Sequence, residues 1–304
     1  MNYKFTIFTP CYNGAKTIHR VFESIECQSY ENFEWIIVND GSKDDSKKVI
    51  EDLMTRSLVK DRIIFLSQAN QGKHTAWRNA LSKATGDLWL PADCDDSFLP
   101  DTLYFLNEKA NMLDILNNNF SGINVCCFDP ETGQIIGTPF PKDGMISDNI
   151  ELEYVYHICG EHWGCQRVDV MKQFPFPEIK GSFYNENYLW FSFAINGYKV
   201  ACYNKPLRAY FYEPSSLCNN KLDRLNSQRI YMWIHYAWWQ IRKAGPFIWR
   251  YSRKGYFDMW ISFIYSSCQI TKLSLKCSIF YSGLMSQILL LKIGCRPILR
   301  QWMN

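Results

Sequence analysis

Three carboxylates in four residues, Asp93, Asp95 and Asp96, follow the apolar run Leu88–Leu90. Buried carboxylates repel one another, and their burial is costly unless a cation lies among them. A divalent metal ion is the simplest cation that fits, and oxygen ligands favour Mg²⁺ or Mn²⁺ over Zn²⁺. Such a metal usually takes its remaining ligands from water and substrate phosphates, so the segment predicts an enzyme that handles a diphosphate. The alternative interpretation is a solvated acidic turn before Pro100.

Three other polar segments end apolar runs, at Thr9–Gly14, Asn39–Ser42 and Asn70–His74. Asp40 could accept a hydrogen bond from a nucleotide base, or it could simply cap the helix that follows. Lys73 stands at a predicted helix N-terminus, and this combination suits a diphosphate, although a surface lysine is an equally good interpretation. Each of these segments is weak as a signal when it is taken alone.

The elements that must position these residues alternate along the first hundred residues. Apolar runs and helical periodicity predict strand 5–9, helix 16–28, strand 33–38, helix 44–56, strand 63–66, helix 72–84 and strand 87–91. This alternation predicts an α/β fold with a mostly parallel sheet flanked by helices, a Rossmann-like nucleotide-binding half. Ligands of such sheets bind at the carboxyl ends of the strands, where all four polar segments fall.

The second part of the chain gives a sparser pattern. We predict helix 101–116, strand 123–128, a hairpin tip at 131–134, helices 168–174 and 187–196, and strands 200–203 and 208–212. The charge distribution then changes. Residues 1–224 hold 22 Lys and Arg against 29 Asp and Glu, whereas residues 225–304 hold 11 basic residues and the single acid Asp258. We therefore expect a catalytic domain at 1–224, divided into halves 1–98 and 99–224, and a separate tail at 225–304.

The tail predicts helices at 230–243, 255–270 and 276–291, with a break at Gly245–Pro246. Its apolar stretches are too short to span a membrane. Aromatic residues interleaved with Arg and Lys are typical of a helix that lies on an anionic bilayer, and the alternative is a helical cap on the α/β body. Without an export signal, the twelve cysteines read as reduced thiols. We expect a cytoplasmic protein, peripheral at the inner face of the membrane.

Taken in order, the polar segments resemble a known family. The four motifs are Thr9–Gly14, Val38–Ser42, Asn70–Asn79 and Leu90–Asp96. Together they resemble a family 2 glycosyltransferase of the GT-A fold, of the kind that builds bacterial surface polysaccharide. The resemblance extends over about residues 4–215 and is best in the first hundred.

The resemblance implies a role for each matching residue on the donor side. Pro10, Tyr12 and Asn13 would line the nucleotide base, and Asp40 would bind that base, usually uracil. Lys73 and Asn79 would belong to the donor site as well. Asp93 would lie near the ribose, the sugar or the metal, Asp95 would bind the Mn²⁺ or Mg²⁺ that bridges the diphosphate, and Asp96 would orient the sugar or the water shell of the metal.

The acceptor side needs a base that takes the proton of the attacking hydroxyl. Family members often carry a Glu-Asp pair before a helix that ends in Gly-Tyr-Lys, and here the pair is Glu186-Asn187. Glu186 is therefore the expected base, unless it only favours the helix N-terminus.

The implied function is a metal-dependent, inverting transfer of a sugar from a nucleotide diphosphate, expected to be UDP, to a hydroxyl of a glycan or lipid-linked acceptor. A nucleotidyltransferase is one alternative, but it would usually carry a glycine-rich basic loop after the first strand. A non-catalytic, membrane-associated nucleotide-sugar-binding protein is the other. Nucleic acid is not an expected partner, since the basic residues of the tail match no recognised module.

Overall fold

The computed structural model describes residues 1–177, 184–212 and 227–270. The chain forms two compact units. The sheet unit consists of Met1–Gly181 and Leu189–Pro214, and the helical unit consists of Ser182–Tyr188 and Ser215–Asn304. The short segment that carries Glu186 thus groups with the helical unit.

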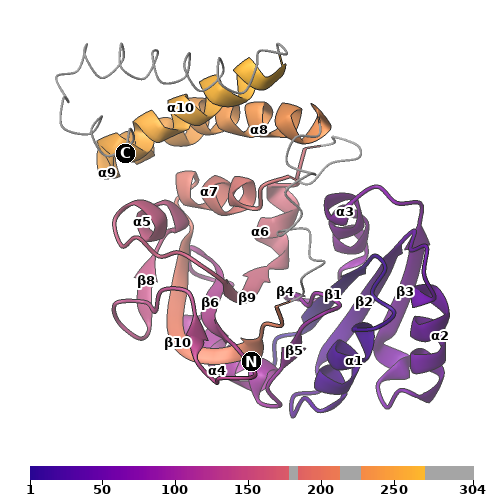
Figure 1. Cartoon of the computed structure of the whole chain (residues 1–304). Coiled ribbons are helices and arrows are strands. Elements are labelled where there is room, and N and C mark those ends of the chain that lie inside the picture. Colours follow the sequence, from indigo (N-terminus) through magenta and orange to yellow (C-terminus); the bar gives the residue numbers. More distant parts are fainter. Residues whose placement is uncertain (178–183, 213–226, 271–304) are drawn as a thin grey trace. The chain divides into compact units, whose positions relative to one another are not determined.

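The first part of the sheet unit alternates strands and helices as predicted (Figure 1). The elements are β1 (Phe5–Cys11), α1 (Ile18–Glu26), β2 (Phe33–Asp40), α2 (Ser46–Arg56), a 3₁₀ turn (Lys60–Arg62), β3 (Ile63–Gln68), α3 (Lys73–Lys83) and β4 (Leu88–Pro91). The strands lie in the order β3-β2-β1-β4, and each neighbouring pair is parallel. The chain adds β2 and β3 on one side of β1 and then returns to add β4 on the other side. Because crossovers are right-handed, the one through α3 covers the opposite face of the sheet from α1 and α2.

Aromatic packing fixes both faces of this parallel sheet. On the α1 face, the rings of Phe22 and Trp35 lie 4.4 Å apart between centroids. On the α3 face, Phe8 lies 5.5 Å from Trp77 and 5.0 Å from Trp89. Successive strand residues point to opposite faces, so each strand contributes to both layers and reads as a continuous apolar run.

The second part of the sheet unit adds a mixed region to the same sheet. Its elements are β5 (Ser97–Phe98), α4 (Thr102–Leu113), β6 (Phe120–Phe128), β7 (Ile135–Ile136), β8 (Met145–Ser147), α5 (Asn149–Tyr154), β9 (His162–Arg167), α6 (Val168–Gln173), α7 (Asn187–Ile195) and β10 (Lys199–Ala209). The full order is β3-β2-β1-β4-β9-β6-β10-β5. β9 runs antiparallel between β4 and β6, and β10 runs parallel to β6. The mixed α/β fold with flanking helices agrees with the predicted fold class.

Two strands differ from the sequence expectation. β9 was not predicted, because His-Trp-Gly-Cys-Gln-Arg has neither an apolar run nor a clean alternation. β10 is one strand rather than the two predicted, with register shifts between Tyr203 and Arg208. Asn204 stabilises this irregular stretch, since its side-chain amide exchanges two hydrogen bonds with the backbone of Phe140, both of 2.8 Å. The predicted hairpin tip at 131–134 is confirmed, since it joins the antiparallel strands β6 and β7.

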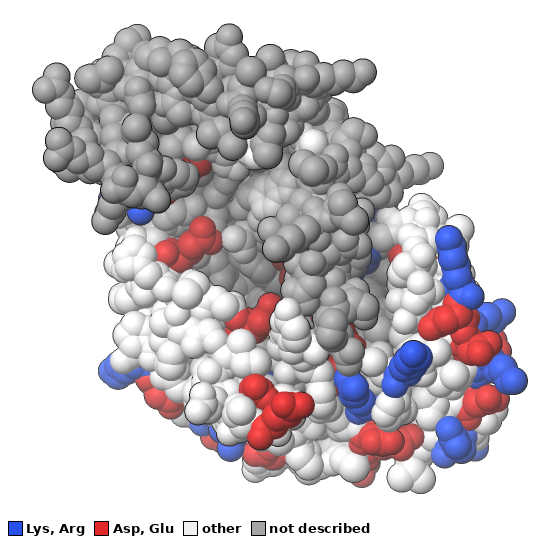
Figure 2. Space-filling model, viewed as in Figure 1, with Lys and Arg blue, Asp and Glu red and all other residues white. Residues whose placement is uncertain are grey.

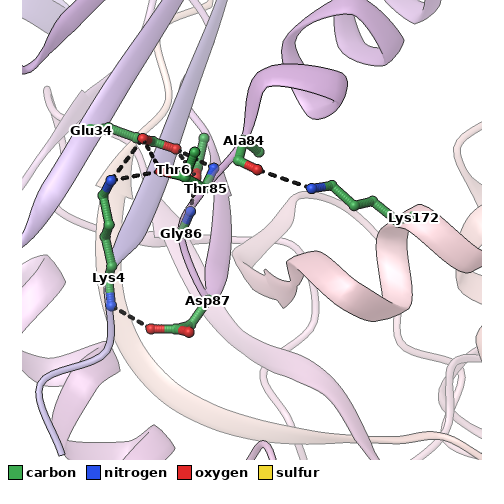
Figure 3. Close-up of polar contacts among 8 residues, drawn as sticks. All are labelled: Lys4, Thr6, Glu34, Ala84, Thr85, Gly86, Asp87 and Lys172. Atoms are coloured by element: carbon green, nitrogen blue, oxygen red, sulfur yellow. Dashed lines mark hydrogen bonds and ion pairs between the residues drawn. The ribbon is translucent and has the colours of Figure 1, made fainter.

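Glu34 is a buried acid that lies away from the carboxyl ends of the parallel strands, and both of its carboxylate oxygens accept hydrogen bonds (Figure 3). Glu34 of β2 accepts from Thr6 Oγ1 at 2.7 Å, from Lys4 Nζ at 2.9 Å and from the Thr85 backbone N–H at 2.7 Å. Burial alone would raise the pKa of Glu34, but these hydrogen bonds and that of the Thr85 hydroxyl lower it to about 2. The cluster ties β1, β2 and the start of β4 together, away from the polar motifs.

The helical unit contains α8 (Ser227–Trp239), a π-helical turn (Gln240–Ala244), α9 (Gly245–Tyr251) and α10 (Arg253–Ile270). A helix boundary lies at the predicted break, since α9 begins at Gly245, with Pro246 in its first turn, where its missing N–H is tolerated. The chain stays helical there, because the π-helical turn leads directly into α9. Trp238 of α8 packs on Phe263 of α10 with centroids 5.4 Å apart. The predicted helix 276–291 falls outside the described residues. Among the described helices, none combines the length and apolarity that a bilayer span requires.

Charges of both signs are interspersed on the described surface of the sheet unit (Figure 2). Lys47 and Glu51 on α2, for example, form an exposed pair at 3.8 Å. Such exposed pairs contribute little to stability, and they leave this face without a broad field of one sign.

Candidate active site

Hydrogen bonds and an ion pair join the four polar motifs in series at the carboxyl ends of β1, β2, β3 and β4. The first motif contacts the second through Asn13, the second contacts the third through Asp40, and the third contacts the fourth through Lys73. Parallel strands bring these ends to one edge of the sheet, which is why motifs far apart in sequence meet.

Asn13 joins the turn after β1 to the loop after β2. Its backbone N–H donates to Ser42 Oγ at 3.0 Å, and its side-chain oxygen accepts from the Lys43 N–H at 2.8 Å. Asn13 has a positive φ of 55°, a conformation that asparagine tolerates better than most residues. On either side of this turn, Pro10 is half-buried in β1 and Tyr12 is 43% exposed, so the tyrosine ring can meet a ligand.

Asp40 ends β2 and holds the loop that leads into α3. It is 4% exposed and accepts hydrogen bonds from Gln68 Nε2 at 2.7 Å, from the Gln71 N–H at 2.9 Å and from the Gly72 N–H at 2.8 Å. Both carboxylate oxygens are therefore engaged within the protein. A carboxylate oxygen can accept more than one hydrogen bond, so this loop-holding role is compatible with a contact to a base.

Asn79 belongs to the same network rather than to the carboxylate turn. Its side-chain amide donates to Gln68 Oε1, and Gln68 in turn donates to Asp40. Asn79 is exposed on α3. The structure thus gives Asn79 a contact through which it orients the amide beside Asp40.

Lys73 opens α3 and points its ammonium group at the carboxylate turn. Its Nζ lies 3.1 Å from Asp93. Burial opposes ionisation of Asp93, but the charges of Lys73 and Arg208 hold the pKa of this carboxyl below its ordinary value. Lys73 therefore brings a positive charge to the edge of the sheet where the four motifs meet.

The turn after β4 holds its three carboxylates in different surroundings. The Asp96 N–H donates to the Asp93 carbonyl at 3.1 Å, which closes the turn. Asp96 is 2% exposed, whereas Asp95 is half-buried. Burial is the main cause that raises the pKa of both Asp95 and Asp96, and neighbouring carboxylates add to it. Both groups would be stabilised in their ionised form by an additional cation.

Arg208 of β10 supplies a buried cation to this turn. Its Nε lies 2.7 Å from Asp96 Oδ2, and its side chain is 9% exposed. The angle of this contact is not that of a hydrogen bond, so both atoms remain without a hydrogen-bond partner among the described residues. Arg208 is more than a hundred residues from Asp96 in the sequence, and the structure brings the two side chains together.

Glu161 is a carboxylate that the sequence reasoning missed. It directly precedes β9, and its Oε2 lies 3.9 Å from Arg208 Nη1. Because β9 was not recognised as a strand, nothing in the sequence indicated that this residue would lie at the carboxyl ends of β4 and β6. A predicted strand at 162–167 would have placed Glu161 at this edge of the sheet.

The described residues contain no preassembled group of three or more His, Cys, Asp or Glu side chains arranged to hold a metal ion. Two buried carboxylate oxygens, Asp93 Oδ1 and Asp96 Oδ2, make no hydrogen bond in that same part of the chain, although each lies in an ion pair, at 3.1 Å from Lys73 Nζ and at 2.7 Å from Arg208 Nε. A carboxylate oxygen in an ion pair still has lone pairs that a metal ion can use. The turn therefore fits a metal that takes only one or two ligands from protein, as Mg²⁺ often does.

Glu186, the expected base, lies on the segment that belongs to the helical unit. Residues on both sides of it contact α8. The Tyr184 hydroxyl and His235 Nδ1 form a 2.9 Å hydrogen bond, and the rings of Tyr188 and Trp239 lie 4.6 Å apart. α8 therefore holds the backbone on either side of Glu186.

Comparison with known proteins identifies the first part of the chain. Residues 6–116 match the family described as Glycosyl transferase family 2. An uncharacterized glycosyltransferase of Nostoc is 33% identical over 113 residues, which are 37% of this chain and 34% of that protein. A GalNAc(5)-diNAcBac-PP-undecaprenol beta-1,3-glucosyltransferase of Campylobacter jejuni is 27% identical over 216 residues, 68% of this chain and 64% of that enzyme. The chain thus spans less than two thirds of these curated relatives.

Solved structures agree in fold. Residues 1–349 of S. aureus TarS, in complex with UDP-GlcNAc, superpose with a TM-score of 0.61 at 16% identity, over 87% of this chain and 72% of that one. The mannosyltransferase PcManGT of Pyrobaculum calidifontis, in complex with GDP-Man and Mn²⁺, gives 0.55 at 16% identity, over 99% and 83%. Residues 6–116 therefore match a glycosyl transferase family 2 domain, as the four motifs imply, and the fold agrees with that of these GT-A structures.

Proposed function

We propose that this protein transfers a sugar from a nucleotide diphosphate, preferably UDP, to a hydroxyl of a glycan or lipid-linked acceptor. The observation that carries the proposal is the meeting of Asp93, Asp95 and Asp96 with Lys73 and Arg208 at the strand ends of a family 2 domain. Acidic and basic side chains at one point suit a ligand that is itself an anion bound with a cation, such as a nucleotide diphosphate with its metal.

The names of the similar proteins support this substrate class. TarS was solved with UDP-GlcNAc, and the Campylobacter relative is named for an undecaprenol-linked acceptor. A further relative, 28% identical over 44% of this chain, is a poly-beta-1,6-N-acetyl-D-glucosamine synthase of Staphylococcus aureus. These names support our proposal that the protein acts in the synthesis of a cell-surface polysaccharide.

On the donor side, Tyr12 and Pro10 would flank the base, while Asp40 and Asn13 would hold the loops around it. Lys73 would meet the diphosphate. Asp95, with Asp93, would hold Mn²⁺ or Mg²⁺, which supplies charge neutralisation to the leaving diphosphate when bound. Asp96, held by Arg208, would orient the sugar.

On the acceptor side, Glu186 would remove the proton of the attacking hydroxyl. The oxygen of that hydroxyl forms a bond to the anomeric carbon as the bond from this carbon to the diphosphate oxygen breaks. One displacement inverts the configuration, and the nucleoside diphosphate leaves with the electron pair. The proton resides on the Glu186 carboxylate until it passes to solvent.

A surface of the helical unit suits an anionic bilayer. Trp238, Phe247 and Trp249 are each at least 40% exposed. Arg242 lies 5.8 Å from the Trp238 ring centroid, and Arg253 lies 5.6 Å from that of Trp249. Aromatic rings paired with guanidinium groups favour the interface of a bilayer with anionic lipids. This surface would hold the enzyme where lipid-linked acceptors are made.

A thermal-shift panel of nucleotide sugars with and without Mn²⁺ tests the donor. A ligand at one hundred times its Kd stabilises the folded state by about 2.7 kcal/mol, so a true donor raises Tm clearly. We expect UDP-sugars to do so only with the metal. Incubation with the best donor then separates the rival enzymes: release of UDP agrees with sugar transfer, and release of pyrophosphate would identify a nucleotidyltransferase. If a nucleotide sugar binds and neither UDP nor pyrophosphate is released, the protein is a non-catalytic nucleotide-sugar-binding protein.

A further inference from the structure

Glu161 is held in place by a tight crossing of two backbone segments. The Thr138 N–H donates to the Cys159 carbonyl at 2.8 Å, and His162 Nε2 lies 2.8 Å from the Thr138 carbonyl oxygen. Gly137 and Gly160 both have positive φ, 86° and 88°. A Cβ on Gly160 would lie 2.4 Å from the Cα of Gly137, so the crossing requires glycine there. The residue between this crossing and β9 therefore has a fixed position.

The carboxylate of Glu161 forms the open end of an ion chain. Arg208 lies between Glu161, at 3.9 Å, and Asp96, at 2.7 Å. The side chain of Asp96 is 3% exposed, whereas that of Glu161 is 42% exposed. The ion chain thus runs from the buried carboxylate turn to solvent, and Glu161 is its most exposed member.

Arg208 engages the two carboxylates of this chain unequally. Its Nε lies 2.7 Å from the buried Asp96 Oδ2, whereas its Nη1 lies 3.9 Å from Glu161 Oε2, which is too far for a hydrogen bond. Arg208 therefore neutralises mainly Asp96, and the Glu161 carboxylate keeps its capacity to accept hydrogen bonds from a ligand.

From this geometry we propose that Glu161 binds the hydroxyl groups of the acceptor sugar, an inference that rests on the proposed sugar transfer. An ionised carboxylate only accepts hydrogen bonds, and sugar hydroxyls donate them; its two oxygens can take two neighbouring hydroxyls at once. The anionic donor diphosphate is repelled by Glu161 and attracted by Lys73 and Arg208. The charges thus favour the uncharged acceptor sugar beside Glu161 and the donor diphosphate beside Lys73 and Arg208.

The test compares Glu161→Gln and Glu161→Asp with Glu131→Gln, which removes an equal charge from the exposed hairpin tip. The probes are the UDP-sugar with the largest thermal shift and a panel of 4-nitrophenyl glycosides as acceptors. Transfer to the glycoside and hydrolysis of the donor by water are measured in parallel for each variant. Thermal unfolding of each variant reports whether it is folded.

We expect Glu161→Gln to raise the acceptor KM about 10- to 100-fold, the effect of a lost hydrogen bond to a charged group. Donor KM and donor hydrolysis should stay at the wild-type level, and Glu161→Asp should recover part of the acceptor affinity. Glu131→Gln should change none of these values.

Three results would overturn the proposal. An unchanged acceptor KM in folded Glu161→Gln excludes binding by this side chain. An equal loss of transfer and donor hydrolysis assigns Glu161 to the donor. A large fall in kcat at constant acceptor KM makes it a proton acceptor. If the wild-type protein neither binds nor cleaves any UDP-sugar, the proposed sugar transfer itself fails, which is a different outcome from any of these.

Discussion

Arg208 Nε lies 2.7 Å from Asp96 Oδ2, and both side chains are buried. Breaking a buried pair by removing one partner leaves an uncompensated charge and costs about 3–5 kcal/mol. We therefore expect Arg208→Met to lower the free energy of unfolding by about this amount.

Urea unfolding of the single and double variants measures this pair. Asp96→Asn combined with Arg208→Met should cost less than the sum of the two single changes, because the residues are in contact. Strict additivity of the two costs would show that the pair does not interact in solution.

Asp95 carries the metal prediction. Asp95→Ala should weaken Mn²⁺-dependent UDP binding by more than about tenfold, since it removes a proposed ligand of the ion. Calorimetric titration with UDP, in Mn²⁺ and in EDTA, makes the measurement. Equal affinity of the variant and the wild type in Mn²⁺ would remove Asp95 from the metal site. Asp101→Ala, at the start of α4, is a control for the loss of a nearby exposed charge.

Glu186 carries the acceptor prediction. Glu186→Gln should reduce kcat by about 10²–10⁴, the usual contribution of a general base, while donor binding stays the same. The reaction with a glycoside acceptor is followed by UDP release. Turnover within a few-fold of wild type would show that another group takes the proton.

Glu34 gives a prediction about stability against pH. Its pKa is about 2 in the folded protein, below the ordinary 4.5 of a glutamate in the unfolded chain, so its contribution to stability is present above pH 4.5 and is lost as the pH falls from about 4.5 towards 2. Glu34→Gln should cost about 2 kcal/mol at pH 7, because it removes hydrogen bonds to a charged group. Urea unfolding at pH 7 and pH 3 should show the gap between variant and wild type narrowing at the lower pH. A constant gap would contradict the lowered pKa.

The helical unit gives a prediction about membranes. Arg242→Gln with Arg253→Gln should weaken binding to phosphatidylserine vesicles by about 2 kcal/mol, at about 1 kcal/mol for each basic residue near the surface. Lys48→Gln with Lys60→Gln removes the same charge from the sheet unit and should leave binding unchanged. Co-sedimentation at low and physiological salt compares the two pairs. If both double variants weakened vesicle binding equally, the net charge of the protein would explain the binding, and the helical unit would have no special role.

The four parallel strands were predictable because each is a largely apolar run that ends in a polar motif. The pairings between motifs were not. Asn13 meets Ser42, and Arg208 meets Asp96, only because β1, β2, β4 and β10 have particular neighbours in the sheet. β9 was not predicted, because its strand conformation follows from its place between β4 and β6 rather than from its own residues. Glu161 was missed with it.

β10 is the last of the described strands along the chain, and this late place in the sequence has a consequence for how the protein is made. During translation the acidic turn emerges first, and Arg208 leaves the ribosome more than a hundred residues later. In the interval, Asp96 has no counter-charge and one edge of β6 has no partner strand. A stalled nascent chain of that length would be a natural client for chaperones, and the final strand would close the sheet and neutralise the turn in a single event.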